Sequence, residues 1–430
     1  MANITAPAVI PSIDRYNYVW ADIGVNVEIS RLDENGHCEL RVTNNGDKLY
    51  LVTQVNLLSN RSVTDIAKRL KSYNDIVWED ILTMVTAHTV DEMRKGEPVV
   101  DVGMEPETMA LDYLLTPILE RNQPTTIYAS GASAKTMVAD AIAVAVQSGV
   151  VLFENAPQPW VPTQGNVLYL DWEASYREHS RRVWAIKQGL KKNGVAITGN
   201  TNFKYRFCTQ PLANELAVIQ KIISENEIVL TIIDSQMPAS GLGQDIGQVA
   251  TAFYNAVRRL RCTTLIIDHK SKSDIYKGED SVGQIGSVVK YNRSRSVFEL
   301  WKSPHVSSNY IELSLRHKKF NEGRLLDDTG IRIQFNKNEN NILESVEFIY
   351  INPLDSPDLA GTTSLVDRID YILNSPMTTD EITEEVNSAS DRKSKKDTVR
   401  TTLNKYAKGD NPRFVKLGER WGRCLDRRDQ

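Results

Sequence analysis

Apolar and polar positions follow two different patterns along this chain, and the pattern changes near residue 105. Apolar residues alternate with polar ones over 25–29, 40–42 and 49–51. A period of two predicts a small antiparallel sheet. Residues 62–70 and 78–93 have helical spacing. We therefore expect residues 1–104 to form a β-rich α+β domain, whose role this pattern does not reveal.

Short apolar runs then alternate with amphipathic stretches. The predicted strands are 125–128, 167–171, 205–208, 229–233 and 264–267, followed by β-rich sequence at 297–300, 311–315 and 346–351. The predicted helices are 135–147, 176–190, 213–225 and 248–260. Strands that alternate with helices are typical of a doubly wound α/β sheet, so residues 105–355 are expected to form such a core.

A further small domain is expected after the core. Pro353, Pro357 and Gly361 mark residues 353–361 as a linker. Three short helices are predicted at 365–373, 379–386 and 396–406, followed by a two-stranded wing over 413–425. This order of elements predicts a winged-helix-like domain over residues 362–430.

Length and composition fit a chain of several globular domains. With 430 residues, 41% hydrophobic and 25% charged, two or three domains can each bury a core. No apolar run is long enough for a membrane span, and the first residues lack the basic start of a secretory signal. We therefore expect a cytoplasmic protein without a membrane partner. Its four cysteines lie far apart without a CxxC pair, which disfavours disulfides and zinc.

Charge is distributed unevenly. The whole chain has a formal net charge of −4, but residues 390–430 contain 13 Lys and Arg against 6 Asp and Glu. The C-terminal end therefore has the charge to meet a polyanion.

One loop has the residues of a phosphate-binding loop (P-loop). After the predicted strand 125–128 the chain reads Ala129-Ser130-Gly131-Ala132-Ser133-Ala134-Lys135-Thr136 and continues as a helix. The free N–H groups and the positive dipole end of this helix would face the phosphates of a nucleotide, and Lys135 would add an ammonium. Thr136 would supply a hydroxyl for Mg²⁺. Alanine stands at 129 and 134, where the strict pattern has glycine. The structural alternative is a small-residue helix start packed under a sheet.

Three more strands end in polar side chains that suit the same chemistry. Glu173 follows one buried strand, Asp234 ends a second and His269 follows a third. In a parallel sheet such ends meet at one edge, beside the P-loop. A carboxylate there can orient or deprotonate water, an aspartate can reach Mg²⁺, and a histidine can donate to the γ-phosphate. Each alone could be an ordinary solvated or loop-capping residue, but together they predict an ATP site.

At this point the sequence resembles the RecA-like P-loop ATPases, and within them the hexameric replicative helicases of the RepA and DnaB type, AAA-family ATPases of plasmids and phages. The resemblance lies in LYLDWEASYREHSRR, IIDSQMPASG, LIIDHKSKSD and GQIGSVVKYNRSRSVFELWK and covers residues 108–353. It implies a catalytic role for Glu173, Mg²⁺ binding by Thr136 and Asp234, and γ-phosphate sensing by His269. It also implies a basic finger from a neighbouring subunit, for which Lys290, Arg293 and Arg295 are candidates.

The same resemblance implies a homo-oligomeric ring, expected to be a hexamer, on single-stranded DNA, with other replication proteins as further partners. Loops 236–247 and 270–284 match the DNA-facing loops of the family in position. Lys270, Lys272 and Lys277 give the second loop its charge, although solvated lysines would look the same. In the C-terminal domain Lys395, Lys396 and Arg400 fit a DNA-reading helix, with protein contact as the alternative.

Three functions remain open from the sequence. The preferred one is an ATP-driven DNA motor, a replicative-type helicase. The second is a recombinase or strand-annealing ATPase that forms filaments. The third is a DNA-binding regulator whose alanine-substituted P-loop does not hydrolyse ATP.

Overall fold

The structure of the protein is a computed structural model. It describes residues 4–12, 15–32, 35–44, 48–95, 110–197, 201–241, 243, 245–270, 288–305, 307–390, 392–409 and 412–424. The chain divides into two compact units. The first comprises Met1–Ala110 and Asn214–Asn226, and the second comprises Leu111–Ala213 and Glu227–Gln430.

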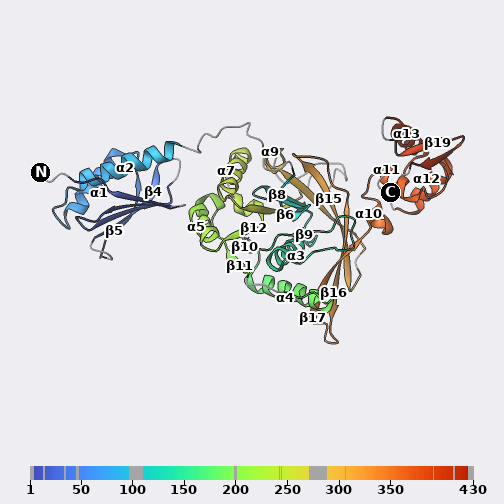
Figure 1. Ribbon diagram of the computed structural model, residues 1–430, viewed down its shortest axis with the longest axis horizontal. Coiled ribbons are helices and arrows are strands. Elements are labelled where there is room, and N and C mark those ends of the chain that lie inside the picture. The colour runs from blue at the N-terminus through green and yellow to red at the C-terminus, as the bar shows by residue number, and fades with distance from the viewer. Residues whose placement is uncertain are drawn as a thin grey trace. The chain divides into compact units, whose positions relative to one another are not determined.

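The first unit contains an antiparallel sheet whose strands follow chain order (Figure 1). Its elements are β1 (Ala8–Ser12), β2 (Arg15–Trp20), β3 (Val25–Ser30), β4 (His37–Asn44), β5 (Lys48–Asn56), α1 (Asn60–Lys71) and α2 (Trp78–Lys95). Every second residue of β3 is buried, as the alternating pattern predicts. Trp20 and Trp78 belong to the core of this unit, so the helices and the sheet share one apolar interior.

The second unit is built on a nine-stranded mixed sheet in the order β11-β10-β12-β13-β8-β14-β15-β16-β17. The strands are β8 (Pro124–Ala129), β10 (Asn166–Asp171), β11 (Phe203–Phe207), β12 (Ile228–Asp234), β13 (Thr263–His269), β14 (Ser296–Lys302), β15 (Tyr310–Phe320), β16 (Thr329–Lys337) and β17 (Leu343–Ile351). The strands from β11 to β14 are parallel, and those from β14 to β17 pair antiparallel.

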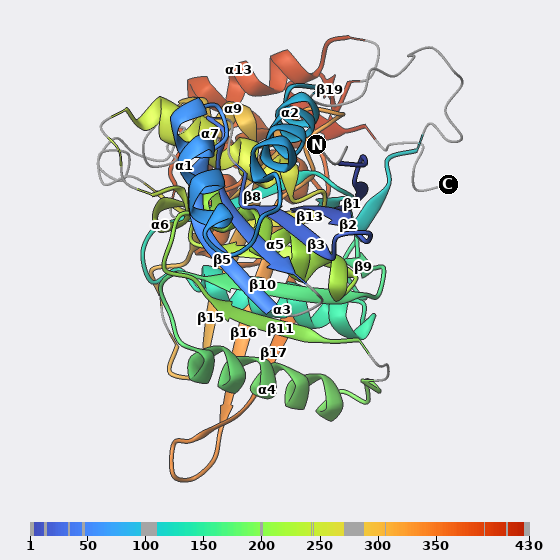
Figure 2. The ribbon, with the colours of Figure 1, turned by 90° about the vertical axis from the view of Figure 1, so that its left-hand side faces the viewer.

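Helices follow the parallel strands along the chain. They are α3 (Lys135–Ser148), α4 (Tyr176–Lys192), α5 (Leu212–Glu225), α6 (Gln236–Ser240), α7 (Ile246–Arg259) and α9 (Val288–Arg293). Helix α3 packs on β8, β10, β12 and β13, and α6 packs on β12 and β13. In Figure 2, α3 and α4 lie below the central strands while α7 and α9 lie above them. Layers on both sides explain why β12 is a nearly unbroken apolar run. The predicted α/β core is confirmed.

Helix α4 packs along the edge strand β17. Gly189 makes this approach possible, because a Cβ there would lie 2.0 Å from the carbonyl oxygen of Val346. A small second sheet of β6 (Tyr113–Thr116), β7 (Leu119–Glu120) and β9 (Val161–Pro162) belongs to the same unit. No described helix is both long and apolar enough to cross a membrane.

The segment predicted as a linker is folded. It forms η1 (Pro353–Asp355) and α10 (Pro357–Ala360), with Leu359 fully buried. Ser303, just after β14, donates a hydrogen bond to Asp358. This stretch therefore packs on the core. Its prolines do not interrupt the fold, because each stands at the start of a short helix.

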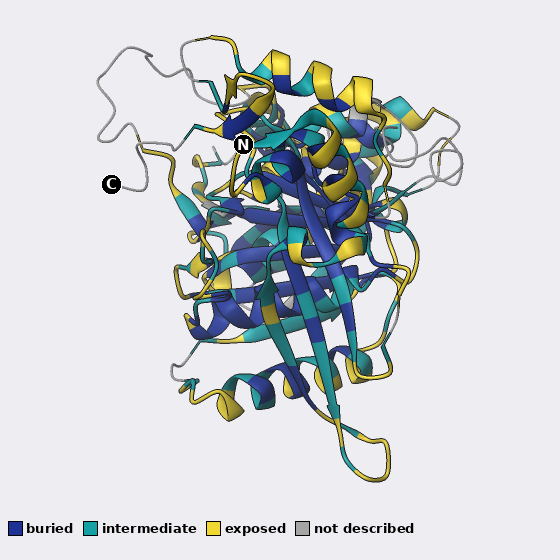
Figure 3. Cartoon of the chain, turned by 90° about the vertical axis from the view of Figure 1, so that its right-hand side faces the viewer, coloured by how far each residue is buried: buried dark blue, intermediate teal, exposed yellow. Residues whose placement is uncertain are grey.

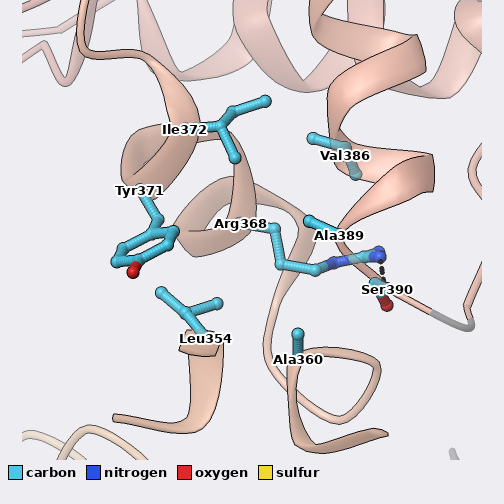
Figure 4. Close-up of a pocket in the computed structure, with 8 residues that line it drawn as sticks. All are labelled: Leu354, Ala360, Arg368, Tyr371, Ile372, Val386, Ala389 and Ser390. Carbon is cyan, nitrogen blue, oxygen red and sulfur yellow. Dashed lines mark hydrogen bonds between the residues drawn. The ribbon is translucent and has the colours of Figure 1, made fainter. Parts of the chain in front are cut away.

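The C-terminal part has its own apolar cluster, which includes Ile369, Leu403 and Trp421. Its elements are α11 (Leu365–Ile372), β18 (Met377–Thr378), α12 (Thr379–Ser388), α13 (Lys396–Tyr406), β19 (Phe414–Leu417) and β20 (Arg420–Arg423), with the strands in the order β18-β20-β19. Figure 4 shows a pocket beside it, lined by residues that include Leu354, Tyr371 and Val386, where the buried Arg368 donates to Ser390 over 3.2 Å. Three helices and a two-stranded hairpin occur where the sequence predicts them.

Candidate active site

The P-loop between β8 and α3 has a backbone that alanine rarely adopts. Ala132 and Ala134 have φ angles of 57° and 59°, in the left-handed region. For residues with a Cβ this conformation costs about 1–2 kcal/mol each. Ala134 is the N-cap of α3, and its side chain caps no N–H group, so the first amides of the helix stay open to an anion. The alanine that replaces the glycine of the strict pattern at position 134 therefore lies in a strained backbone conformation.

Lys135 lies inside this loop with only 7% of its surface exposed. Its Nζ donates to the carbonyl oxygens of Ser130 over 3.0 Å and Ala129 over 3.3 Å, and lies 3.4 Å from Nδ1 of His269. Burial lowers the pKa of this ammonium, while nearby carboxylates, Asp234 first among them, act in the opposite direction. A bound phosphate would offer the ammonium a stronger, charged acceptor than these carbonyls.

Thr136 and Asp234 form a pair at the bottom of the site. The Thr136 hydroxyl donates to Oδ2 of Asp234 over 2.8 Å, and the hydroxyl of Tyr169 donates to the same oxygen over 2.8 Å. Burial raises the pKa of Asp234. One hydroxyl and one carboxylate fit Mg²⁺, which takes few protein ligands and completes its octahedron with phosphate oxygens and waters. Within the described residues, no group of three or more His, Cys, Asp or Glu side chains is arranged to hold a metal ion.

Glu173 and His269 complete the arrangement. Nε2 of His269 lies 3.5 Å from Oε1 of Glu173, and the hydroxyl of Ser235 donates to the same oxygen. The hydrogen bond from His269 lowers the pKa of Glu173, so this side chain is a carboxylate at neutral pH. About 45% of the Glu173 side chain is exposed, which leaves it open to water.

The strand register explains why these groups meet. Asp171 pairs with Asp234 across β10 and β12, and His269 pairs with Ala129 across β13 and β8. The carboxyl ends of four parallel strands therefore lie side by side. Lys135 contacts His269 over 3.4 Å, and His269 in turn contacts Glu173 over 3.5 Å. The structure thus brings together the four groups whose convergence the sequence predicts.

A buried ionic triad behind Glu173 was not predicted. Nδ1 of His179 lies 2.8 Å from Oδ1 of Asp140, and its Nε2 lies 3.3 Å from Oδ2 of Asp171. Although burial opposes it, the two carboxylates raise the pKa of His179 to about 9. Oδ1 of Asp171 accepts the N–H groups of Glu173 and Ala174 over 2.8 and 2.9 Å. The triad therefore joins the P-loop helix to the turn that presents Glu173.

A second unpredicted contact involves Lys302, at the end of β14. Its Nζ donates to the carbonyl oxygen of Ala132 over 3.2 Å, so this cation lies on the P-loop of its own subunit. The sequence offered one signal, since Lys302 is the cation at the carboxyl end of a strand that neighbours β8.

The three candidates for a finger from another subunit differ in position. Lys290 is 5% exposed and its Nζ lies 3.6 Å from Asp268, so its charge is compensated within the subunit and the finger prediction does not fit it. Arg293 ends α9 and is partly exposed. The N–H group of Arg295 donates to Pro124 at the start of β8, at the sheet edge opposite the P-loop. Arg293 and Arg295 remain the candidates.

Of the three lysines predicted to bind DNA after β13, only Lys270 lies among the described residues. Lys270 is largely buried and its Nζ lies 2.9 Å from Glu299, which disfavours a role on DNA. Lys272 and Lys277 lie outside the described residues. The first predicted DNA loop begins as helix α6 rather than as a loop.

The basic residues of the C-terminal part lie on or beside α13. Lys395 precedes the helix, Lys396 contacts Asp380 over 2.8 Å and Arg400 contacts Asp397 over 2.9 Å. The side chains of Lys396 and Arg400 are more than half exposed. Their weak surface ion pairs leave them able to exchange partners.

Part of the chain is similar to a known protein family. Residues 89–274, less than half of the chain, match the model of a family described as AAA domain. A comparison with curated proteins gives no match. Among solved structures, the chain is similar to the crystal structure of a KaiC-like protein from the hyperthermophilic archaeon Pyrococcus horikoshii. The identity is 12% and the TM-score 0.36, over 56% of this chain and 94% of that chain. Residues 89–274 are therefore similar to an AAA domain, and the arrangement of Lys135 and the Thr136–Asp234 pair at the loop suits a nucleotide site.

Proposed function

We propose that this protein is an ATP-driven motor on single-stranded DNA, of the ring-forming replicative helicase type, with hydrolysis at subunit interfaces. The convergence of Lys135, Glu173, His269 and the Thr136–Asp234 pair at one sheet edge carries the proposal. These are the groups that phosphoryl transfer to water requires.

Each residue then has a defined task. The amides of the P-loop and the Lys135 ammonium bind the β- and γ-phosphates, and Lys135 exchanges its carbonyl acceptors for phosphate oxygens. Thr136 and Asp234 would hold Mg²⁺, which would supply positive charge to the phosphates. Glu173 accepts a proton from the attacking water, in line with the γ-phosphorus, and Ser235 orients the carboxylate through its hydrogen bond.

His269 connects the site to the chain that follows it. One ring nitrogen lies near Lys135 and the other near Glu173, so the imidazole senses whether a γ-phosphate separates them. Arg293 or Arg295 would reach the phosphates of a neighbouring subunit, which requires an assembly of adjoining subunits, a ring in the function proposed here.

The C-terminal part supports a role on DNA through its elements. Three helices, a β-hairpin and the exposed cations on α13 suit a winged-helix domain that contacts phosphates.

A second candidate function is favoured by the strained P-loop. Ala134 occupies a left-handed position that glycine would adopt without strain, which would weaken nucleotide binding in a non-hydrolysing regulator. Ala134→Gly distinguishes the two functions. A motor already active with alanine gains little turnover, whereas a regulator that the alanine has silenced gains ATP binding.

The decisive experiment is a titration of ATP turnover against single-stranded and duplex DNA. For the motor we expect stimulation by single strands, loss of turnover in Lys135→Ala and Glu173→Gln, and retained ATP binding in Glu173→Gln. Lys68→Ala, an exposed lysine on α1, serves as the control for a lost charge. Turnover that ignores DNA would contradict the motor, and absence of ATP binding would favour the regulator.

A further inference from the structure

Helix α4 has an unusual charge composition for a helix on an acidic chain. It contains a single acid, Glu178, and six cations: Arg177, Arg181, Arg182, Lys187, Lys191 and Lys192. Glu178 accepts a hydrogen bond from the Ser175 N–H over 3.2 Å and so caps the start of the helix. The positive charge of α4 is therefore not neutralised within the helix.

The outer face of α4 arranges four of these cations around an aromatic ring. Trp184 is 52% exposed, and Arg177, Arg181, Lys187 and Lys191 lie seven or three residues before and after it. Side chains at these spacings share one stripe of an α-helix. We call these five residues the α4 outer face. Figure 3 shows exposed positions alternating with buried ones along this helix.

The opposite side of the helix fixes the orientation of this face. His179, Ala185, Ile186 and Gly189 are buried, and Gly189 lies against β17. The helix cannot rotate without breaking these contacts, so Trp184 stays turned to solvent.

Within the described residues, no carboxylate forms an ion pair with any cation of the α4 outer face. Arg177 and Arg181, and likewise Lys187 and Lys191, are i,i+4 pairs of like charge, which destabilise a helix. The charge of Lys191 also contributes to a lowered pKa of Lys187, after burial of that lysine. A bound polyanion would remove this repulsion.

The pattern suits single-stranded nucleic acid better than other polyanions. Exposed indole rings stack on unpaired bases, and cations beside them follow the phosphate backbone. The bases of a duplex are already stacked, so the indole would find no partner there. The stripe from Arg177 to Lys191 spans about 21 Å at 1.5 Å per residue, enough for several nucleotides.

We propose that the α4 outer face binds single-stranded nucleic acid, with Trp184 stacked on a base and the four cations on phosphates. The choice of this polyanion rests on the proposed motor function, whereas the surface itself involves none of the residues of the ATP site.

The test is the affinity of the full chain, without nucleotide, for a fluorescein-labelled oligothymidylate, measured by anisotropy at several salt concentrations. Trp184→Ala should weaken binding roughly five- to 150-fold, as loss of one stacked base does, and Trp184→Phe should restore much of it. Arg177→Ala with Arg181→Ala should reduce the slope of log affinity against log salt by about 1.4. Lys68→Ala with Lys71→Ala on α1 is the matched control and should change neither quantity.

Unchanged affinity and salt slope in the α4 variants would overturn the proposal. If these variants instead changed only the assembly state seen by light scattering, the face would contact protein and the proposal would again be wrong. Lys135→Ala separates the two proposals, because it should abolish turnover and leave oligothymidylate affinity intact. Loss of binding in Trp184→Ala alone would support the α4 outer face even if the protein hydrolysed no ATP.

Discussion

The two sides of helix α4 differ in whether their charged side chains are paired. On the inner side, His179 is almost fully buried between the carboxylates of Asp140 and Asp171. On the outer side, five residues further on, Trp184 lies in solvent among cations that have no carboxylate within reach in the described structure. One helix thus contributes a rigid ionic triad to the ATP site and an unpaired basic stripe to the surface.

This difference follows from the cost of removing a charge from water. A buried ion must be paired, and its partners then fix the geometry around it. An exposed cation is hydrated, so it can remain unpaired until a ligand arrives. Substitutions on the inner side should therefore change stability and the catalytic turn, whereas those on the outer side should change binding and alter stability by no more than about 0.5 kcal/mol.

The largest effect is expected when the inner cation is removed. His179→Leu leaves two carboxylates buried without a counter-charge, which destabilises the fold by about 3–5 kcal/mol. Turnover should fall as well, because Asp171 holds the amides of Glu173 and Ala174. Urea unfolding measures the first effect and ATP turnover the second.

The outer face provides the control for this variant. Trp184→Leu removes a larger side chain, but stability should stay within about 0.5 kcal/mol because the site is exposed. A His179→Leu protein as stable as Trp184→Leu would mean that the inner triad is not ionic. If the double variant Asp140→Asn with His179→Leu is more stable than His179→Leu alone, the uncompensated carboxylates cause the loss of stability.

Stability should also depend on pH through the inner triad. The folded-state pKa of His179 is about 9, above its ordinary 6.5, so its contribution is complete below pH 6.5 and disappears as pH rises through 9. The shift corresponds to roughly 3 kcal/mol. The pKa of Asp171 is lowered to about 2, so its contribution is lost only on acidification from pH 4 towards 2.

The measurement is the urea midpoint at pH 6 and pH 9, compared between the natural protein and His179→Gln. Only the natural protein should lose this stability over that interval. An equal loss in both proteins would show that other groups cause it.

The sequence predicted the parts of the fold that local pattern determines. Strands buried on both faces, such as β12, appear as apolar runs, and the polar residues that end them form the candidate ATP site. No strand is predicted over β1, which contains Pro11; β1 is an edge strand, where proline is tolerated. Strand β16 was missed although Ile331, Ile333 and Phe335 alternate with polar residues.

The inner triad could not be derived from any local pattern. Asp140 and His179 are 39 residues apart and meet only through the packing of α3 on α4. One signal was present, since Asp140 is an isolated acid inside the apolar helix α3, and a buried acid requires a partner. The sequence shows the need for a partner but not which residue supplies it.

A smaller effect is expected where α4 meets β17. Gly189→Ala places a Cβ 2.0 Å from the carbonyl oxygen of Val346, so helix and strand must separate. Overpacking of this kind costs about 1–3 kcal/mol, which urea unfolding would detect. Ser180→Ala, on the exposed side of the same helix, controls for the added helix propensity and should not destabilise. A stable Gly189→Ala protein would show that α4 can shift on β17.

The smallest effect is expected on the outer face, and its sign is opposite. Arg181→Glu turns the like-charge pair with Arg177 into an i,i+4 pair of opposite charge, which should stabilise the fold by about 0.2–0.5 kcal/mol. The same change should weaken oligothymidylate binding and flatten its salt dependence, because one phosphate contact is lost and one acid is added. A thermal shift assay and the anisotropy titration test both. Destabilisation together with unchanged binding would mean that Arg181 serves the fold, and the contrast between the two sides of α4 would not hold.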